Sequence, residues 1–240
     1  MNKKVLRALN GPSATEVTLG ALLSLILGVA LAALYLTFKP VSVVNKLPDP
    51  NKREEGMVYY LQGGKDVGKD RLLLRKQQLF VEGNSITLTE DELNAWLGSN
   101  NPTPKKPEAE PPPEGGDAKP APKTPLFTPN ELNFRILTED GKGVLQIGYP
   151  CTLDMIGLDG AVIVQMRGDF RKAGDIFVYE PTTFLIGSLP AQRIPALAAF
   201  VLQKIYAAQQ LPDEAELLAA WKKLENVTIE GNSLRLTMAK

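Results

Sequence analysis

An uncharged run over residues 17–38 constrains this chain more than any other feature of its sequence. A helix rises about 1.5 Å per residue, so a helix of this length spans roughly 33 Å, enough to cross a hydrocarbon core of about 30 Å. Glu16 precedes the run, and Lys39 and Pro40 follow it. No polar face interrupts the run, which argues against a helix packed on the core of a soluble domain. We therefore predict a transmembrane helix over residues 17–38.

The flanks of this run indicate its orientation. Basic residues occur on both sides, but orientation follows the short flank, because long domains translocate largely regardless of charge. We therefore place residues 1–16 in the cytoplasm and the main domain outside it. A cleaved signal peptide is the alternative, since Ala30-Leu31-Ala32 has the shape of a cleavage site. Against it, the apolar run continues to Phe38.

The composition excludes several classes of function. The sequence has 27 basic and 27 acidic residues, one cysteine and no histidine. A balanced charge without a basic stripe argues against nucleic acid as a partner, and a single cysteine excludes an intrachain disulfide. The absence of histidine removes the commonest general base and most zinc and copper ligand sets. We therefore expect no cofactor, no metal site and no catalytic residue.

Proline content divides the rest of the chain. Residues 39–99 are predicted to form a stalk and the helical N-terminal part of the soluble domain, with helices over 66–81 and 89–97. Residues 100–125 contain nine prolines and no aliphatic residue larger than alanine, which predicts a disordered linker. Pro104 and Pro107 form a PxxP, so a ligand for an SH3-type domain is the alternative to a plain spacer.

The sequence after the linker, residues 126–240, indicates an antiparallel domain. Apolar residues recur at every second position in four segments: 132–136, 145–155, 162–170 and 176–186. Turns at 157–160 and 171–175 are too short for crossover connections. Two helices, 196–209 and 213–224, precede a hairpin that turns at Gly231-Asn232. We predict an α+β fold in which the transmembrane helix is followed by a curved antiparallel sheet packed on amphipathic helices.

Few side chains support an enzymatic function. Acidic residues near strand ends are Asp154, Asp159, Asp169, Asp175 and Glu180, and a glycosidase would need a pair of such carboxylates. Two of them fall in predicted turns, where aspartate is favoured for local hydrogen bonds. Cys151 lies on an apolar strand face, as a small buried hydrophobe does. Ser188 has no nucleophile elbow and no histidine partner.

Three long strands, each with one apolar face, are predicted to lie opposite two helices with wide apolar stripes. A sheet wrapped on helices beside a bilayer can leave an apolar groove, which is the default site for an acyl chain. We expect such a groove to be lined by Leu145, Ile147, Tyr149, Leu153, Val162, Val164, Met166, Phe200 and Trp221.

The segment LTEDELNAWL, Leu88–Leu97, begins with a capping box of Thr89 and Glu92. This capped helix, the strand meander and the sequence GSLP…IP at 187–195 together resemble anchored bacterial envelope proteins distantly related to tubular lipid-binding (TULIP-like) domains. The resemblance covers residues 85–240, with the linker as an insertion. It implies a strongly curved sheet wrapped around helix, an apolar interior and a role near lipids.

These observations predict a single-pass protein of the bacterial inner membrane, with its main domain on the periplasmic side. We expect this domain to bind or sense an apolar, lipid-like ligand in the bacterial envelope. The alternative is a structural or assembly protein that binds an envelope protein partner through a sheet edge or through the proline-rich linker.

Overall fold

The computed structural model describes residues 11–64, 70–100, 127–129, 132–139, 141–155, 158–208 and 214–239. The predicted linker beyond Asn100, the start of the predicted cytoplasmic tail and the predicted helix cap Asp213 lie outside these ranges.

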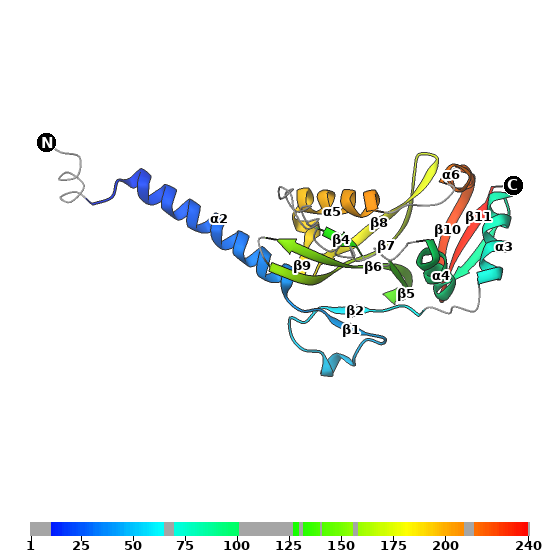
Figure 1. The fold of residues 1–240 in the computed structure, drawn as a ribbon, viewed down its shortest axis with the longest axis horizontal. Coiled ribbons are helices and arrows are strands. Elements are labelled where there is room, and N and C mark those ends of the chain that lie inside the picture. The colour runs from blue at the N-terminus through cyan, green and yellow to red at the C-terminus, as the bar shows by residue number, and fades with distance from the viewer. Residues whose placement is uncertain are drawn as a thin grey trace, which may run out of the picture.

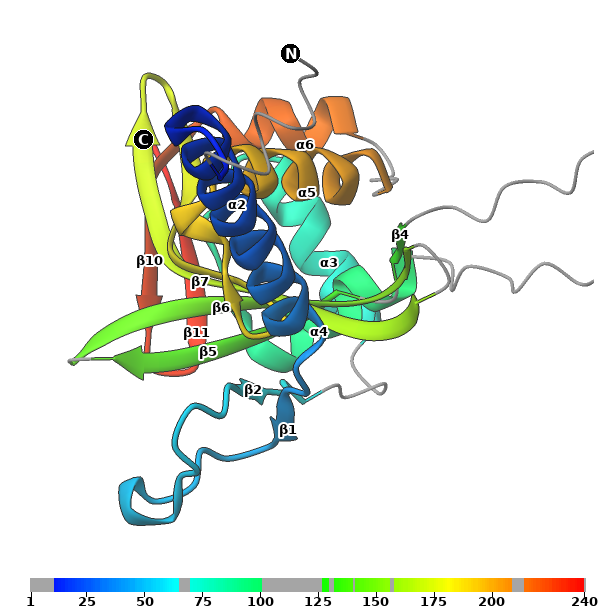
Figure 2. The same ribbon diagram turned by 90° about the vertical axis from the view of Figure 1, so that its left-hand side faces the viewer.

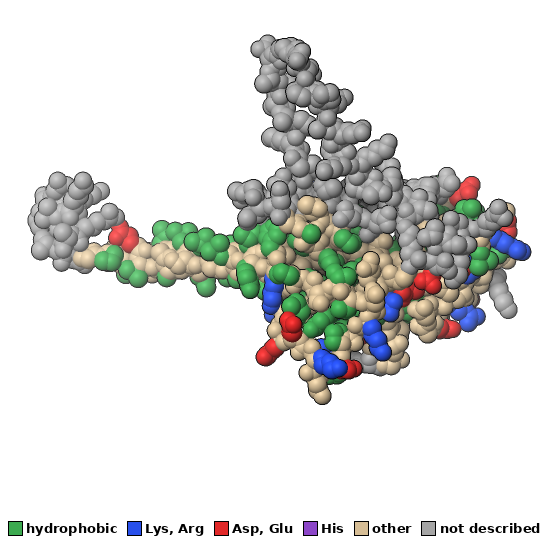
Figure 3. Space-filling model, turned by 60° about the horizontal axis from the view of Figure 1, so that its bottom comes forward, with side chains coloured by type: hydrophobic (Ala, Val, Ile, Leu, Met, Phe, Trp, Pro, Cys, Tyr) green, Lys and Arg blue, Asp and Glu red, His purple; other side chains and the backbone are tan. Residues whose placement is uncertain are grey.

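The apolar run forms helix α2, Ala14–Phe38, which projects from the domain (Figure 1). It begins three residues earlier than predicted because Ser13 and Glu16 form a capping box. Ser13 Oγ accepts from the Glu16 N–H at 3.3 Å, and Glu16 Oε2 accepts from the Ser13 N–H at 3.2 Å. Apolar side chains cover the visible length of α2 (Figure 3), and no residue of it is buried. Its length and composition allow it to cross a membrane, as a single span or as a signal anchor.

The alternating segments after the linker build a six-stranded antiparallel sheet. Its strands are β4 (Phe127–Pro129), β5 (Asn133–Glu139), β6 (Lys142–Met155), β7 (Leu158–Ala173), β8 (Ile176–Ile186) and β9 (Leu189–Pro190). The long strands β6, β7 and β8 form the predicted meander, with Ile147 opposite Met166 and Phe170 opposite Tyr179. Both β4 and β5 pair with β6. The α+β class and the antiparallel pairing are thus confirmed.

Strand β7 is longer than predicted at both ends. Leu158 already pairs with Met155, so residues 158–160 continue the strand instead of forming a loop. At the other end Ala173 pairs with Ile176, and Gly174, at a φ of 64°, takes the turn. Glycine adopts a positive φ at little steric cost, which explains why the turn is made at Gly174.

A second antiparallel sheet joins segments from both sides of the linker. Its strands are β3 (Ile86–Thr89), β10 (Leu224–Glu230) and β11 (Ser233–Met238), in the order β10-β11-β3. The hairpin of β10 and β11 is confirmed, and Gly231 in its turn has a φ of 60°. The pairing of β3 with β11 makes these strands a separate sheet, where we predicted a single one.

In the described part of the domain there are four further helices: α3 (Asp70–Val81), α4 (Glu90–Asn100), α5 (Pro195–Ala208) and α6 (Glu214–Trp221). Short 3-10 turns occur at η1 (Pro50–Lys52) and η3 (Ala191–Arg193). The capping box before α4 is present: Glu92 Oε2 accepts from the Thr89 N–H at 2.8 Å, and Thr89 Oγ1 accepts from the Glu92 N–H at 3.4 Å. Helix α4 continues past its predicted end to Asn100.

The residues directly after α2 lie against the six-stranded sheet. They include two short parallel strands, β1 (Ser42–Val44) and β2 (Tyr59–Leu61). Gln146 Nε2 donates to the Leu61 carbonyl at 2.6 Å, and the Arg167 guanidinium donates to the Tyr59 carbonyl at 3.2 Å. The segment predicted as a stalk is therefore attached to the domain along one sheet face.

The end of α2 also packs directly on the domain. The Ser188 N–H donates to the Leu36 carbonyl at 2.9 Å, which satisfies one of the carbonyls that a helix end leaves unpaired. Gly187 approaches the same turn so closely that a Cβ there would lie 2.1 Å from the Thr37 carbonyl oxygen. The C-terminal end of α2 is thus in direct backbone contact with the residues between β8 and β9, and no flexible linker separates the helix from the domain.

Candidate functional site

An apolar cavity of about 290 Å³ lies between the two antiparallel sheets, with helices α3, α4 and α6 around it. The residues that line it are Phe80, Leu88, Leu93, Trp96, Phe134, Leu145, Ile147, Phe170, Tyr179, Leu217, Trp221, Leu234 and Leu236. All thirteen are aliphatic or aromatic, and both tryptophans of the chain are among them.

Strand alternation positions the walls of this cavity. Side chains at every second position of a strand share one face, so Leu145 and Ile147 of β6 face the interior together. Across the cavity, Leu234 and Leu236 do the same from β11. The two sheets thus present apolar faces to one another, and the cavity is the space that these faces leave unfilled.

Four aromatic rings form a connected wall. Trp221 contacts Phe80 edge-on, with centroids 6.5 Å apart, and Phe170 at 6.0 Å. Phe170 in turn meets the Tyr179 ring at 5.7 Å and 65°. Such edge-to-face pairs are favoured by the ring quadrupoles, so this wall has defined geometry although it borders a void.

Two polar atoms of the lining bond to backbone. The Tyr179 hydroxyl donates to the Leu145 carbonyl at 2.8 Å, and Trp221 Nε1 donates to the Phe177 carbonyl at 2.8 Å. Burial raises the pKa of Tyr179, which keeps its hydroxyl neutral. With these donors engaged, the wall offers hydrocarbon and aromatic contacts and no acid, base or nucleophile.

The structure brings together a third of the predicted groove residues. The three that line the cavity are Leu145, Ile147 and Trp221. Four more are buried in the adjoining core: Tyr149, Val162, Val164 and Met166. Phe200 is 43% exposed on α5, away from the cavity, and the side chain of Leu153 lies outside the described residues.

Sequence reasoning missed most of the opposite wall. Leu88, Leu234 and Leu236 were visible as alternating apolar residues, and Phe80, Leu93 and Trp96 as apolar residues of predicted helices. The missing information was the pairing of β3 with β11, which brings these segments opposite β6.

The polar residues of the LTEDELNAWL segment attach α4 to the free edge of β5. Asn94 Oδ1 accepts from the Phe134 N–H at 2.6 Å, and Asn94 Nδ2 donates to the Phe134 carbonyl at 2.8 Å. Glu90 Oε2 accepts from the next outward N–H, that of Ile136, at 2.9 Å. These side chains replace the partners that a neighbouring strand would supply, so the edge of β5 is occupied.

The two buried carboxylates of this helix are also fully engaged. Glu90 Oε1 meets Arg135 Nη1 at 2.8 Å, and Glu92 meets Lys76 Nζ at 2.7 Å. Burial alone would raise the pKa of Glu92, but hydrogen bonds from Lys76 and Thr89 and the Lys76 charge outweigh it and lower that pKa. An ionised, paired carboxylate of this kind stabilises the fold and is not poised as a general acid.

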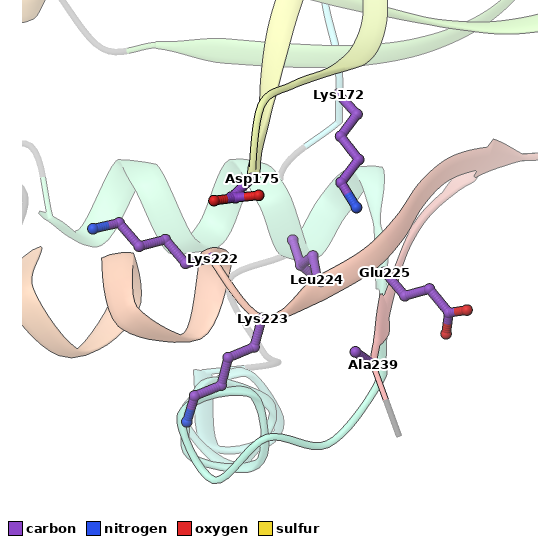
Figure 4. A pocket seen from close by; sticks show the side chains of 7 residues that line it. All are labelled: Lys172, Asp175, Lys222, Lys223, Leu224, Glu225 and Ala239. Atoms are coloured by element: carbon purple, nitrogen blue, oxygen red, sulfur yellow. The ribbon is translucent and has the colours of Figure 1, made fainter.

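Two cross-strand pairs bring four of the five candidate acids opposite one another: Asp169 with Glu180 on β7 and β8, and Asp154 with Asp159 on β6 and β7. Asp169 accepts from the Phe170 N–H, and Glu180 pairs with exposed Arg171. Asp175 lies in an open groove of about 720 Å³ between the β7–β8 hairpin and the start of β10, with three lysines and a glutamate (Figure 4). The side chains of Asp154 and Asp159 lie outside the described residues.

Cys151 is buried, and the described residues contain no cluster of metal ligands. The Cys151 thiol is buried and donates to the Val162 carbonyl at 3.2 Å, and burial raises its pKa to about 12. It is therefore a thiol and not a nucleophilic thiolate at neutral pH. Within the described ranges, no three acidic or sulfur ligands come together as a metal site.

Comparison with known proteins gives no relative: no family model, no curated protein and no solved structure matches this chain.

Proposed function

We propose that this chain is a single-pass membrane protein of the bacterial envelope whose extracytoplasmic domain binds an apolar, lipid-like ligand in the cavity between its two sheets. It acts by holding or sensing that ligand and catalyses no reaction. The observation that carries the proposal is the lining of the cavity, in which Tyr179 and Trp221 bond to backbone and every residue is aliphatic or aromatic.

The volume of the cavity bounds the ligand. At about 290 Å³ it is roughly twice the ~150 Å³ cavity that accepts benzene, and it lies near the lower end of ligand pockets, about 300 Å³. A medium-length acyl chain or a small ring system fits this space, whereas a whole phospholipid does not. The lack of a charged group in the wall means that a carboxylate or headgroup must stay outside.

Two further observations support the proposal. The helix α2 can anchor the domain at a membrane, where acyl chains are available. The resemblance to tubular lipid-binding domains implies a curved sheet around helix and an apolar interior, and the cavity is consistent with that implication.

The tryptophans provide a direct test. Full-length protein in nanodiscs is titrated with a brominated medium-chain fatty acid, since bromine quenches tryptophan fluorescence on contact. Because Trp96 and Trp221 both line the cavity, we expect saturable quenching. No saturable quenching with any chain length, together with an apoprotein mass in native mass spectrometry, would overturn the proposal.

A matched pair of variants on α6 locates the binding. Leu217 lines the cavity, and its neighbour Leu218 is 51% exposed. Leu217→Phe should weaken binding roughly tenfold, because the larger ring overfills the cavity when the ligand occupies it, and overfilling costs about 1–3 kcal/mol. Leu218→Phe should leave it unchanged. Equal effects of the two would place the ligand elsewhere.

The alternative function is assembly with an envelope protein, and the structure leaves one sheet edge unsuitable for it. The edge of β5 is occupied by Asn94 and Glu90, so a partner strand cannot add there without displacing α4. A stoichiometric protein partner recovered with an empty cavity would favour this alternative.

A further inference from the structure

We infer that helix α5 lies in the headgroup region of the bilayer beside α2 and fixes the orientation of the domain on the membrane. This inference rests on the proposed membrane anchoring by α2, but not on the ligand proposed for the cavity.

The position of α5 follows from the contact between α2 and the sheet. The Ser188 N–H bonds to the Leu36 carbonyl, two residues before α2 ends. The chain then passes through β9 and η3 directly into α5 at Pro195. Figure 1 shows α5 over the half of the domain from which α2 projects, and in Figure 2, which faces that end, α5 lies behind α2. If α2 spans the bilayer to Phe38, α5 is held next to the membrane surface.

The exposed side of α5 is unusually apolar for a helix in water. Its inner side packs Leu197, Val201 and Leu202 on the domain. In its first two turns the outer side has Phe200, 43% exposed, among alanines, and Ile194 just before the helix is 36% exposed; Gln203 and Lys204 follow on the same side. A surface helix normally carries charged residues throughout its outer side, so the uncharged first two turns indicate a second apolar environment.

The charges around α5 match an anionic membrane surface. Between Glu180 and Asp213 the sequence has no acidic residue, and its two charges are Arg193 and Lys204. Lys204 lies one turn beyond Phe200, and its ammonium group is 5.6 Å from the centroid of that ring. A lysine that follows an aromatic ring in this way can reach phosphate groups while the ring enters the interface.

The orientation that results is specific. With α2 and α5 both on the membrane, the domain has two attachment sites and cannot rotate freely about its anchor. The sheet that contains β3, β10 and β11 then lies at the end of the domain remote from α2 (Figure 1).

The test measures the depth of single positions in the full-length chain. The variants Phe200→Cys, Leu74→Cys and Leu27→Cys are labelled with an environment-sensitive fluorophore. Unlabelled wild type is the blank, because buried Cys151 does not react. Each protein is placed in nanodiscs of phosphatidylcholine and phosphatidylglycerol, with and without spin-labelled lipids. Leu27 marks the centre of α2, and Leu74, 64% exposed on α3, marks surface remote from the membrane.

We expect quenching by spin-labelled lipid at positions 27 and 200, with a blue shift at 200, and neither at 74. Quenching at 27 alone would overturn the placement of α5 and leave the anchor intact. Equal quenching at 200 and 74 would show non-specific adsorption and also overturn it. No quenching at 27 would refute the membrane anchor, and the placement of α5 with it. The readout needs no ligand, so an empty cavity would not affect the result.

Discussion

Leu145 and Gln146 are neighbours in β6, and both side chains are buried, but they point to opposite faces of the six-stranded sheet. Leu145 faces the cavity among hydrocarbon side chains. Gln146 faces the segment that follows α2, where it donates to the Leu61 carbonyl and accepts from Arg167 Nε at 3.0 Å. We call these the apolar face and the polar face of the sheet.

The two faces are covered in physically different ways. Hydrophobic contact is non-directional, so the apolar face tolerates an unfilled space of about 290 Å³. Hydrogen bonds need fixed geometry, and the polar face holds β2 in one position. Tyr60 packs so closely on Gly148 that a Cβ there would lie 2.1 Å from the Tyr60 hydroxyl oxygen. The apolar face is therefore suited to binding ligands of varied shape, whereas the polar face holds the segment with β2 in one position.

The largest effect is expected from the apolar face. Leu145→Ala should lower the free energy of unfolding by about 3 kcal/mol, since it enlarges an existing void. Unfolding of the full chain in mild detergent, followed by tryptophan fluorescence, measures this loss. Leu72→Ala, at a position 49% exposed on α3, is the control and should change stability by less than about 0.5 kcal/mol. Equal losses would mean that Leu145 does not belong to a packed core.

On the polar face, Gln146→Met should lower the free energy of unfolding by about 2 kcal/mol, because it leaves the Leu61 carbonyl and Arg167 without this partner. The loss should be accompanied by faster proteolysis after Lys52 and Arg53, as β2 detaches from the sheet. Unchanged proteolysis would show that the hydrogen bonds do not hold this segment.

A second buried glutamine on the polar face should behave in the opposite way. Gln165 is 1% exposed, and neither its amide nitrogen nor its amide oxygen has a hydrogen-bond partner among the described residues. Gln165→Met should therefore stabilise the protein by about 1 kcal/mol, since a desolvated amide is replaced by an apolar group of similar shape. The same unfolding measurement compares it with Gln146→Met. If both variants were less stable than the wild type, the proposed difference between the hydrogen-bonded Gln146 and the unbonded Gln165 would be wrong.

The smallest effect is expected in the dependence of stability on acidic pH, through Glu92. The pKa of Glu92 is lower in the folded protein than its ordinary value of 4.5, so the folded state favours the charged form. Its contribution to stability is present above pH 4.5 and is lost as the pH falls through the lowered pKa. Glu92→Gln should remove this part of the acid sensitivity while lowering stability at pH 7. An unchanged slope between about pH 5 and pH 3 would contradict the Lys76–Glu92 pairing.

The parts of the fold that sequence could predict are those governed by local pattern. Alternation located β5 to β8 and the hairpin of β10 and β11, and the Thr89–Glu92 spacing located the start of α4. Each of these depends on residues close in sequence, where propensity and periodicity act directly.

The parts that could not be predicted depend on pairing across long separations. Nothing local marks Leu88 as the neighbour of Leu234, or Gln146 as the partner of Leu61. The cavity required both sheets to be placed, so only the residues of β6 and α6 were found in advance. Asn94 shows the same limit: a polar residue on a predicted helix carries no sign that it will bond to β5.

The order of the strands has a consequence for how the protein is made. In the sheet β10-β11-β3 the central strand is β11, and Ile86 pairs with Leu236. During synthesis β3 emerges long before its partner β11. Strand β3, which contributes Leu88 to the cavity wall, cannot pair until the residues of β11 up to Met238 have been added. The sheet β10-β11-β3 is therefore completed only after β11 has been translated, and a truncation within 233–238 removes part of the strand that pairs with β3.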